Sequence, residues 1–187
     1  MKQPNINPTD LDINNSTDKL TPVKFIIGGV NATKGEFPWQ GLLVWKDNTG
    51  GTFLCGATLI GKNYAMTAAH CAEDMRVSTS VLQFGIIDSE YDRTGVVRIS
   101  QKFIHPNYIA TDYEVHNDIA ILKLSTSVGE NTNIKTIALP VDDSQMITGT
   151  GIVTGWGHYY YNGQISKDPS RFLQQATIDF ISPAYCK

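Results

Sequence analysis

The sequence predicts an all-β domain, a sandwich or a barrel, and three observations lead to this class. From Phe25 onward, short apolar runs alternate with turn residues. No long segment shows the hydrophobic period of an amphipathic helix, and no repeat of fixed length is present. Glycine-containing breakers lie between the apolar runs, as at residues 47–51, 61–63, 92–95 and 162–163, and such breakers are typical of the corners of antiparallel sheets.

The apolar runs predict the strands one by one. In chain order they are residues 42–45, 53–60, 65–67, 81–87, 96–104, 119–124, 152–154 and 176–181. A proline-containing, acidic connection at residues 138–143 follows the first six runs and can join two sheet units. Only two runs follow it, and two strands do not form a stable unit of their own, so we expect the second unit to be unfinished.

Composition narrows the class of protein. The 187 residues are 41% hydrophobic and 18% charged, which fits one globular domain. Residues 1–25 differ, since polar residues dominate there, and we expect a flexible leader. The formal charge of -3, without a run of basic residues, argues against nucleic-acid and membrane-surface partners. No apolar stretch is long enough to cross a bilayer, and the first 20 residues lack the apolar block of a signal peptide.

Two segments combine residue types that suit acid–base chemistry. His70 lies between small residues and a cysteine in TAAHC, residues 67–71, where the imidazole stays accessible. Asp118 comes directly before the apolar run of residues 119–122, where a partly buried carboxylate needs a donor. An acid that holds a histidine in one tautomer is the supporting half of a nucleophilic triad. Each signal alone also fits a structural histidine or a solvated turn.

Several motifs occur together in a recognisable order. They are IIGG (26–29), EFPWQ (36–40), CGATLI (55–60), TAAHC (67–71), HPNY (105–108), NDIAIL (117–122), LP (139–140) and TGWG (154–157). Together they resemble the trypsin/chymotrypsin family of serine endopeptidases, from Ile26 to Lys187. The resemblance implies a chymotrypsin-like double antiparallel β-barrel, with a complete first barrel at residues 26–138 and the truncated start of a second at residues 141–187.

The resemblance also implies catalytic roles. His70 would be the general base and then the general acid, and Asp118 its orienting carboxylate. The family's nucleophile is the serine of a G-D-S-G-G-P segment, and the 187 residues contain neither that segment nor any G-x-S-x-G. We therefore expect this chain to lack the nucleophile, the oxyanion donors and the specificity pocket, and to be inactive on its own. His116 is a competitor for Asp118, while His105 and His158 are expected to be structural or surface residues.

The resemblance also implies different roles for the three cysteines. Cys55 and Cys71 match a disulfide of the family, which would fix the position of His70. Cys186 matches a cysteine whose partner lies further along the chain than Lys187, so we expect it to be unpaired. A zinc site at Cys55, His70 and Cys71 is disfavoured, because adjacent His and Cys rarely ligate one ion. No metal and no cofactor is expected.

Activation departs from the family's usual pattern. The resemblance makes the protein a zymogen in which Ile26 becomes the new N-terminus after cleavage. Phe25, rather than Lys or Arg, precedes Ile26, so cleavage there needs an enzyme other than a trypsin. The alternative is that residues 26–27 simply open the first strand.

Three further segments of the sequence are compared with the pattern of the family. Asp88, Glu90 and Asp92 occupy its calcium loop, but Ile86 replaces the first acidic ligand, so we expect a solvated acidic turn in preference to a weak calcium site. Gly151 replaces a cysteine, so no bridge between barrels is expected there. Residues 159–161, three tyrosines, are expected to form an exposed loop in preference to a substrate contact.

The sequence as a whole predicts a serine endopeptidase that acts on protein or peptide substrates and meets protease inhibitors. A non-catalytic homologue, a binding or regulatory module that has lost its nucleophile, is the alternative. The disulfide and the N-x-S/T sequons at Asn14, Asn15 and Asn31 favour a secreted protein. The short length, the unpaired Cys186 and the missing serine have one common explanation, namely that the chain ends before its second barrel closes.

Overall fold

The structure, a computed structural model, describes residues 29–46, 51–141, 149–158, 160–161, 164–165 and 168–180, without the side chains of residues 160–161 and 164–165. Several expectations fall on residues outside these ranges. They concern the leader at residues 1–25, the N-terminal Ile26, the first of the three tyrosines and the unpaired Cys186.

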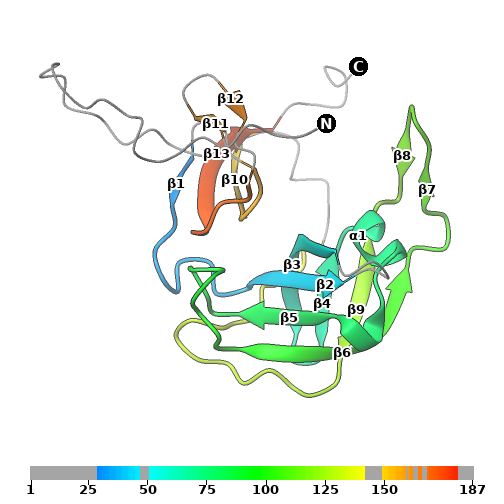
Figure 1. The fold of residues 1–187 in the computed structure, drawn as a ribbon, viewed down its shortest axis with the longest axis horizontal. Coiled ribbons are helices and arrows are strands. Elements are labelled where there is room, and N and C mark those ends of the chain that lie inside the picture. The colour runs from blue at the N-terminus through cyan, green and yellow to red at the C-terminus, as the bar shows by residue number, and fades with distance from the viewer. Residues whose placement is uncertain are drawn as a thin grey trace, which may run out of the picture.

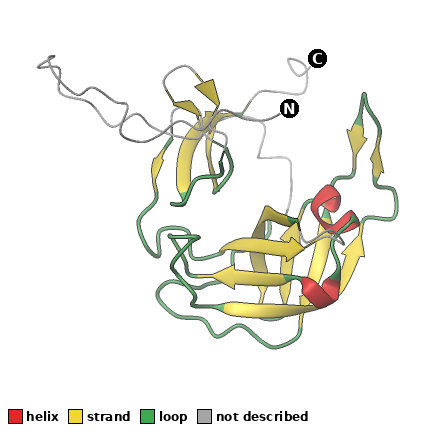
Figure 2. Ribbon diagram, viewed as in Figure 1, coloured by secondary structure: helices red, strands yellow, loops and turns green. Residues whose placement is uncertain are grey.

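Strands dominate the described residues, and helices are short (Figures 1 and 2). In chain order the elements are β1 (Val30–Asn31), β2 (Gln40–Lys46), β3 (Thr52–Gly61), β4 (Tyr64–Thr67), α1 (Ala69–Glu73), the 3₁₀ turn η1 (Val77–Thr79), β5 (Val81–Phe84), β6 (Val96–Ile104), β7 (Ile109–Ala110), β8 (Val115–His116), β9 (Ala120–Leu124), β10 (Thr150–Gly155), β11 (Tyr160–Tyr161), β12 (Gln164–Ile165) and β13 (Gln174–Asp179).

A closed barrel holds the first core. Its strands follow the order β2-β3-β4-β9-β6-β5, and all the pairings are antiparallel. Alternate side chains point inward, as the period of two in a strand requires. The buried inward residues include Leu43, Leu59, Leu82, Phe84 and Leu122, each 0% exposed. Because the ring of strands is closed, the barrel has no unpaired edge along these strands.

One expected barrel strand is shorter than its apolar run. The run of residues 81–87 predicts a strand to Ile87, but β5 ends at Phe84. Gly85 follows with a φ of +70°, a left-handed conformation outside the extended range of a regular strand. Ile86 is then free to turn away from the barrel, and it is buried in a second cluster.

The second unit is a three-stranded antiparallel sheet with the order β1-β13-β10 (Figure 1). The sequence places residues 30–31 in the first barrel, but β1 pairs with Gln174 and Gln175 of β13 instead. The barrel strands themselves run from Gln40 to Leu124. Pairing with a strand more than 140 residues away has no signal in the local apolar pattern, which explains the difference.

The two units are joined by apolar packing and hydrogen bonds. Leu42 on the outer face of the barrel shares a buried cluster with Trp156 and Leu173 of the second unit. The indole Nε1 of Trp156 donates to the carbonyl of Ile87 (3.0 Å). Thr154 Oγ1 donates to Gln40 Oε1 (2.6 Å). The outer face of the barrel is therefore a second packing surface.

Short elements complete the fold where the sequence predicts none. The hairpin β7–β8 extends from the barrel beside α1, as Figure 1 shows. Gly151, where a cysteine bridge is not expected, pairs with Ile178 in the second sheet. It lies against the Phe180 ring, and a Cβ at residue 151 would come within 2.7 Å of that ring.

Among the described residues, no helix has the length and apolar character needed to cross a membrane.

Candidate active site

His70 is presented by the short helix that follows β4. Ala68, Ala69 and Ala72 surround it in the sequence, and the last two are fully buried. These small side chains let α1 pack closely against the barrel while the histidine side chain faces outward. The His70 side chain is 61% exposed. The expected accessibility of the imidazole is thus present in the structure.

Asp118 lies in the tight connection between β8 and β9. Asn117, just before it, has a φ of +54°, a left-handed conformation that asparagine tolerates better than most residues. The Asn117 side-chain amide donates to the carbonyl of Asn107 (2.8 Å), which holds this turn. The backbone N–H of Ile119 donates to the Asn117 carbonyl (2.7 Å) in this turn, and the carboxylate of Asp118 contacts His70 of α1 just before β9 begins.

The two residues meet although 48 positions separate them. His70 Nδ1 lies 2.7 Å from Asp118 Oδ2, and the backbone N–H of His70 donates to Oδ1 (2.9 Å). A carboxylate can only accept, so Nδ1 carries the proton of this bond. The hydrogen bond from the His70 backbone is the largest cause that holds the pKa of Asp118 below its usual value, and the His70 ring adds to it. The acid is therefore ionised at neutral pH, and the tautomer of His70 with its proton on Nδ1 has Nε2 unprotonated.

The competing histidine has a different partner. His116 Nε2 lies 2.5 Å from Glu114 Oε2, within the β7–β8 hairpin. His105 accepts a hydrogen bond at Nδ1 from the backbone N–H of Asn107 (3.2 Å). His158 is exposed in the loop after β10. Of the four histidines, all of which lie in the described ranges, His70 is the one hydrogen-bonded to Asp118.

The expected disulfide between Cys55 and Cys71 is confirmed. It ties α1 to β3, with Cα atoms 6.3 Å apart. His70 Nε2 lies 3.3 Å from Cys71 Sγ, so the ring, the disulfide and Asp118 form one compact group. The three side chains Cys55, His70 and Cys71 are close enough to suggest a metal site, but both sulfurs are bonded to each other and offer no thiolate.

Comparison with known proteins identifies the family to which the chain with this histidine–aspartate pair belongs. The sequence pattern of the family described as Trypsin matches residues 26–187. The chain belongs to the trypsin family of serine proteases. It is 37% identical over 171 residues to trypsin-1 of Astacus astacus, a match that covers 87% of this chain and 68% of the relative. It is 32% identical over 167 residues to fibrinolytic enzyme isozyme C of Lumbricus rubellus, which covers 86% and 65%.

A third relative is much longer. Serine proteinase stubble of Drosophila melanogaster is 32% identical over 177 residues, which make up 89% of this chain and 21% of that protein. The chain therefore spans about two thirds of the length of the Astacus astacus and Lumbricus rubellus relatives. Together with the closed barrel, the family membership confirms the expected chymotrypsin-like double β-barrel class.

The acidic segment at residues 86–92 differs from the expected solvated turn. Asp88 accepts from Arg171 Nε (3.0 Å) and Nη2 (2.7 Å), and from the backbone N–H groups of Glu90 and Tyr91. Asp92 accepts from the backbone of Ile87 (3.1 Å). The expectation of a solvated turn is wrong for these two carboxylates. Arg171, 83 residues further on, supplies the opposite charge to Asp88, and Lys34 supplies it to Asp92 (3.4 Å).

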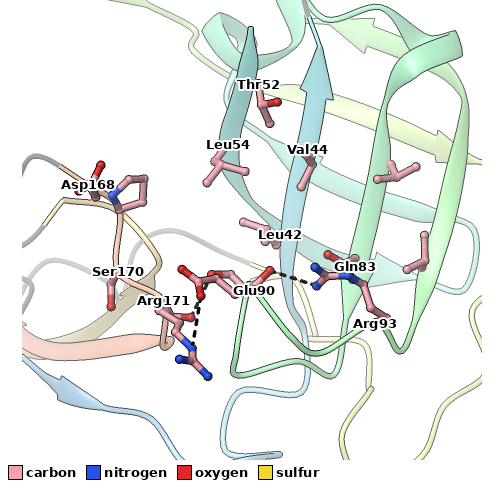
Figure 3. Close-up of a pocket in the computed structure, with 14 residues that line it drawn as sticks. Leu42, Val44, Thr52, Leu54, Gln83, Glu90, Arg93, Asp168, Ser170 and Arg171 are labelled. Atoms are coloured by element: carbon pink, nitrogen blue, oxygen red, sulfur yellow. Dashed lines mark hydrogen bonds and ion pairs between the residues drawn. The ribbon is translucent and has the colours of Figure 1, made fainter. Parts of the chain in front are cut away.

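A groove of about 680 Å³ lies next to this ion pair and away from the dyad. Figure 3 shows Leu42, Val44 and Leu54 of the barrel's outer face on one side, with Asp168 and Arg171 across from them. Neither His70 nor Asp118 lines the groove. The groove belongs to the boundary between the two units and is separate from the histidine–aspartate pair.

Two contributors to the site were absent from the sequence-based prediction. Asn117 has a recognisable signal, because asparagine tolerates the left-handed conformation that this tight turn needs. The bond from the His70 backbone to Asp118 has no such signal, since it depends on how α1 meets β9 in space.

Proposed function

We propose that this chain provides the histidine–aspartate half of a serine endopeptidase that hydrolyses peptide bonds in protein substrates. The observation that carries the proposal is the hydrogen bond of 2.7 Å between His70 Nδ1 and Asp118 Oδ2. The orienting bond leaves the second ring nitrogen to exchange protons with a nucleophile. Membership of the trypsin family supports the same reaction class.

In this proposal His70 acts twice. Its Nε2 takes the proton from a serine hydroxyl as the oxygen attacks the peptide carbonyl carbon, and then gives that proton to the departing amine. A water molecule repeats the sequence, with its proton passing to Nε2 and then to the serine oxygen. Asp118 remains ionised throughout, and it keeps the ring oriented and stabilises the imidazolium. The depressed pKa of Asp118 suits this role, because the carboxylate stays charged at neutral and mildly acidic pH.

The nucleophile in this scheme is a serine that the 187 residues do not include, because no G-x-S-x-G segment is present among them. We therefore expect the 187-residue chain alone to be inactive on peptide substrates. The disulfide supports secretion, because a bond such as Cys55–Cys71 persists in oxidising compartments. Cleavage before Ile26 to release a new amino terminus, and inhibition by protein inhibitors, complete the proposal.

A fluorophosphonate probe tests whether the protein, isolated from its source, has an activated serine. We expect covalent labelling of one serine within a G-D-S-G-G segment, and no labelling of the 187-residue chain. The rate of labelling should fall by at least about 100-fold in the His70→Ala variant, since the hydroxyl loses its general base. An isolated protein that is folded but not labelled, with Gly or Ala at the serine position, would contradict the proposal and favour the non-catalytic homologue.

A further inference from the structure

The carbonyl end of the helix that carries His70 is bound by a single ammonium group. Lys102 Nζ donates to the carbonyls of Ala72 (2.6 Å), Glu73 (2.8 Å) and Met75 (2.9 Å). The last carbonyls of any helix lack partners within the helix, and α1 has only five residues. A lysine ammonium has three donors, and here two bind the last two residues of α1 while the third binds Met75, just after the helix. Charge-assisted bonds of this kind are the stronger hydrogen bonds of proteins.

A bulge in β6 explains why a lysine reaches this place. Val97 and Ile99 are buried in the barrel, and regular alternation would send residues 101 and 103 inward after them. The register between β6 and β9 shifts between Ile99 and Gln101. After this bulge, Lys102 is the half-buried residue and Phe103 is exposed. Hydrogen bonds from the Ser100 hydroxyl to the carbonyls of residues 123 and 124 hold the irregular pairing.

The same pair of strands binds both ends of α1. β9 begins two residues after Asp118, and its residues Ala120 and Leu122 pair with Ile104 and Lys102 of β6. Asp118 accepts the backbone N–H of His70 near the start of the helix, while Lys102 binds the carbonyls at its end. The helix is thus held at its amino end by a carboxylate and at its carbonyl end by an ammonium, the charges that suit each end.

We propose that Lys102 is a positioning residue for His70. By binding the end of α1 to the β6–β9 ladder, its ammonium keeps the helix in the orientation in which His70 Nδ1 meets Asp118 Oδ2. Lys102 touches no reacting atom, and among the residues that the structure describes its ammonium forms no ion pair with a carboxylate. The inference rests on the proposed function only for its kinetic test, since the geometry it explains is that of the dyad.

Variants at Lys102 separate the effect of its hydrogen-bond donors and charge from the effect of its side-chain packing. Lys102→Met keeps the apolar stem and removes the donors, whereas Lys102→Arg keeps both the charge and the donors. Lys46→Met is the matched control, because Lys46 is exposed at the end of β2. In the whole enzyme we expect Lys102→Met to lower kcat by about 10- to 100-fold with little change in KM, because a small displacement of a catalytic group costs rates of this order. Lys102→Arg should recover most of the rate, and Lys46→Met should match the parent protein.

A spectroscopic measurement on the 187-residue chain tests the inference without catalysis. The His70 Nδ1 proton in its bond to Asp118 should give a low-field NMR signal, separate from the backbone amide signals. We expect this signal to broaden or vanish in Lys102→Met while the signals of the barrel core remain, and to persist in Lys102→Arg and Lys46→Met. This result would support the inference even if the enzyme proved inactive, so failure of the proposed function and failure of this inference are distinguishable.

Three outcomes would overturn the inference. The first is a folded Lys102→Met protein that keeps both the His70 signal and the parental kcat. The second is a rise in KM at unchanged kcat. The third is a loss of activity that only follows the unfolded fraction. If Lys102→Met does not fold, Lys102→Gln, which keeps two donors without the charge, is measured in its place. If both variants fail to fold, Lys102 is a structural residue and the inference is wrong.

Discussion

Asp118 accepts two hydrogen bonds from one residue, and this double contact explains how an exposed histidine is held still. Its Oδ2 contacts the ring Nδ1 of His70, and its Oδ1 contacts the backbone N–H. The ring therefore cannot turn away without losing the 2.7 Å bond, and the helix cannot shift without losing the 2.9 Å bond. Packing alone would not fix the ring orientation, because an imidazole that is 61% exposed has few packing contacts.

Replacing Asp118 with asparagine tests this double role. The amide can accept one of the two bonds but would present an N–H to the other, so it favours the wrong tautomer of His70. We expect kcat of the whole enzyme to fall by about 10⁴-fold, the loss known for the same change in the triad of the trypsin family. Asp112→Asn is the control, because Asp112 is an exposed residue of the β7–β8 hairpin. Equal kcat values for the two variants would contradict the role of Asp118.

At the scale of elements, local patterns predicted the barrel strands well and their exceptions poorly. The run of residues 96–104 coincides with β6, because alternating burial of Val97 and Ile99 leaves a clear signal. The bulge after Ile99 leaves none, and neither does the pairing of β1 with β13. Both depend on partners that are distant in the sequence. The short pairs β7–β8 and β11–β12 contain only two residues per strand, too few for any periodic pattern.

His70 and Asp118 were predictable because each lies in a local sequence motif. TAAHC and NDIAIL are local motifs, so His70 and Asp118 could be found in the sequence, and their pairing followed from the family resemblance. The partners that support them could not be found in this way. Lys102 is one of several lysines in polar contexts, and only the bulge in β6 directs it to the end of α1.

At the scale of the whole molecule, an ion pair fastens the loop after β5 to the segment before β13. Arg171 contacts Asp88 and also lies over the rings of Tyr91 (4.4 Å) and Phe172 (4.9 Å). Backbone bonds accompany it, including Ser89 N–H to the Arg171 carbonyl (2.9 Å). The hydrogen bond from Arg171 is the largest cause that lowers the pKa of Asp88 to about 2. The second unit is therefore attached to the barrel partly by charge.

This attachment should show in the acid dependence of stability. A carboxyl group whose pKa is lower in the folded protein stabilises it above the unfolded pKa, near 3.8, and this stabilisation is lost as the pH falls through about 2. We expect Arg171→Met to be less stable than the parent at neutral pH, with a deficit that stays constant down to about pH 5 and shrinks between pH 4 and 2.

Urea unfolding midpoints across this pH range measure the deficit. Arg93→Met is the control, because the Arg93 guanidinium donates to backbone carbonyls of Ser89 and Asp92 and its loss removes no carboxylate partner. The deficit of the control should not follow the titration of a carboxyl group. A deficit of Arg171→Met that is as large at pH 2 as at pH 7 would show that the aromatic contacts, and not the ion pair, carry the stabilisation.

Peptide hydrolysis by paired histidine variants of the whole enzyme tests the central claim most directly, namely that His70 is the proton carrier held by Asp118. We predict that His70→Ala lowers kcat/KM by at least about 10⁴-fold, while His116→Ala, which removes only the contact to Glu114, stays within about threefold of the parent. The two proteins should unfold at similar urea concentrations, since both side chains are exposed. Full activity of His70→Ala together with loss of activity in His116→Ala would contradict the account.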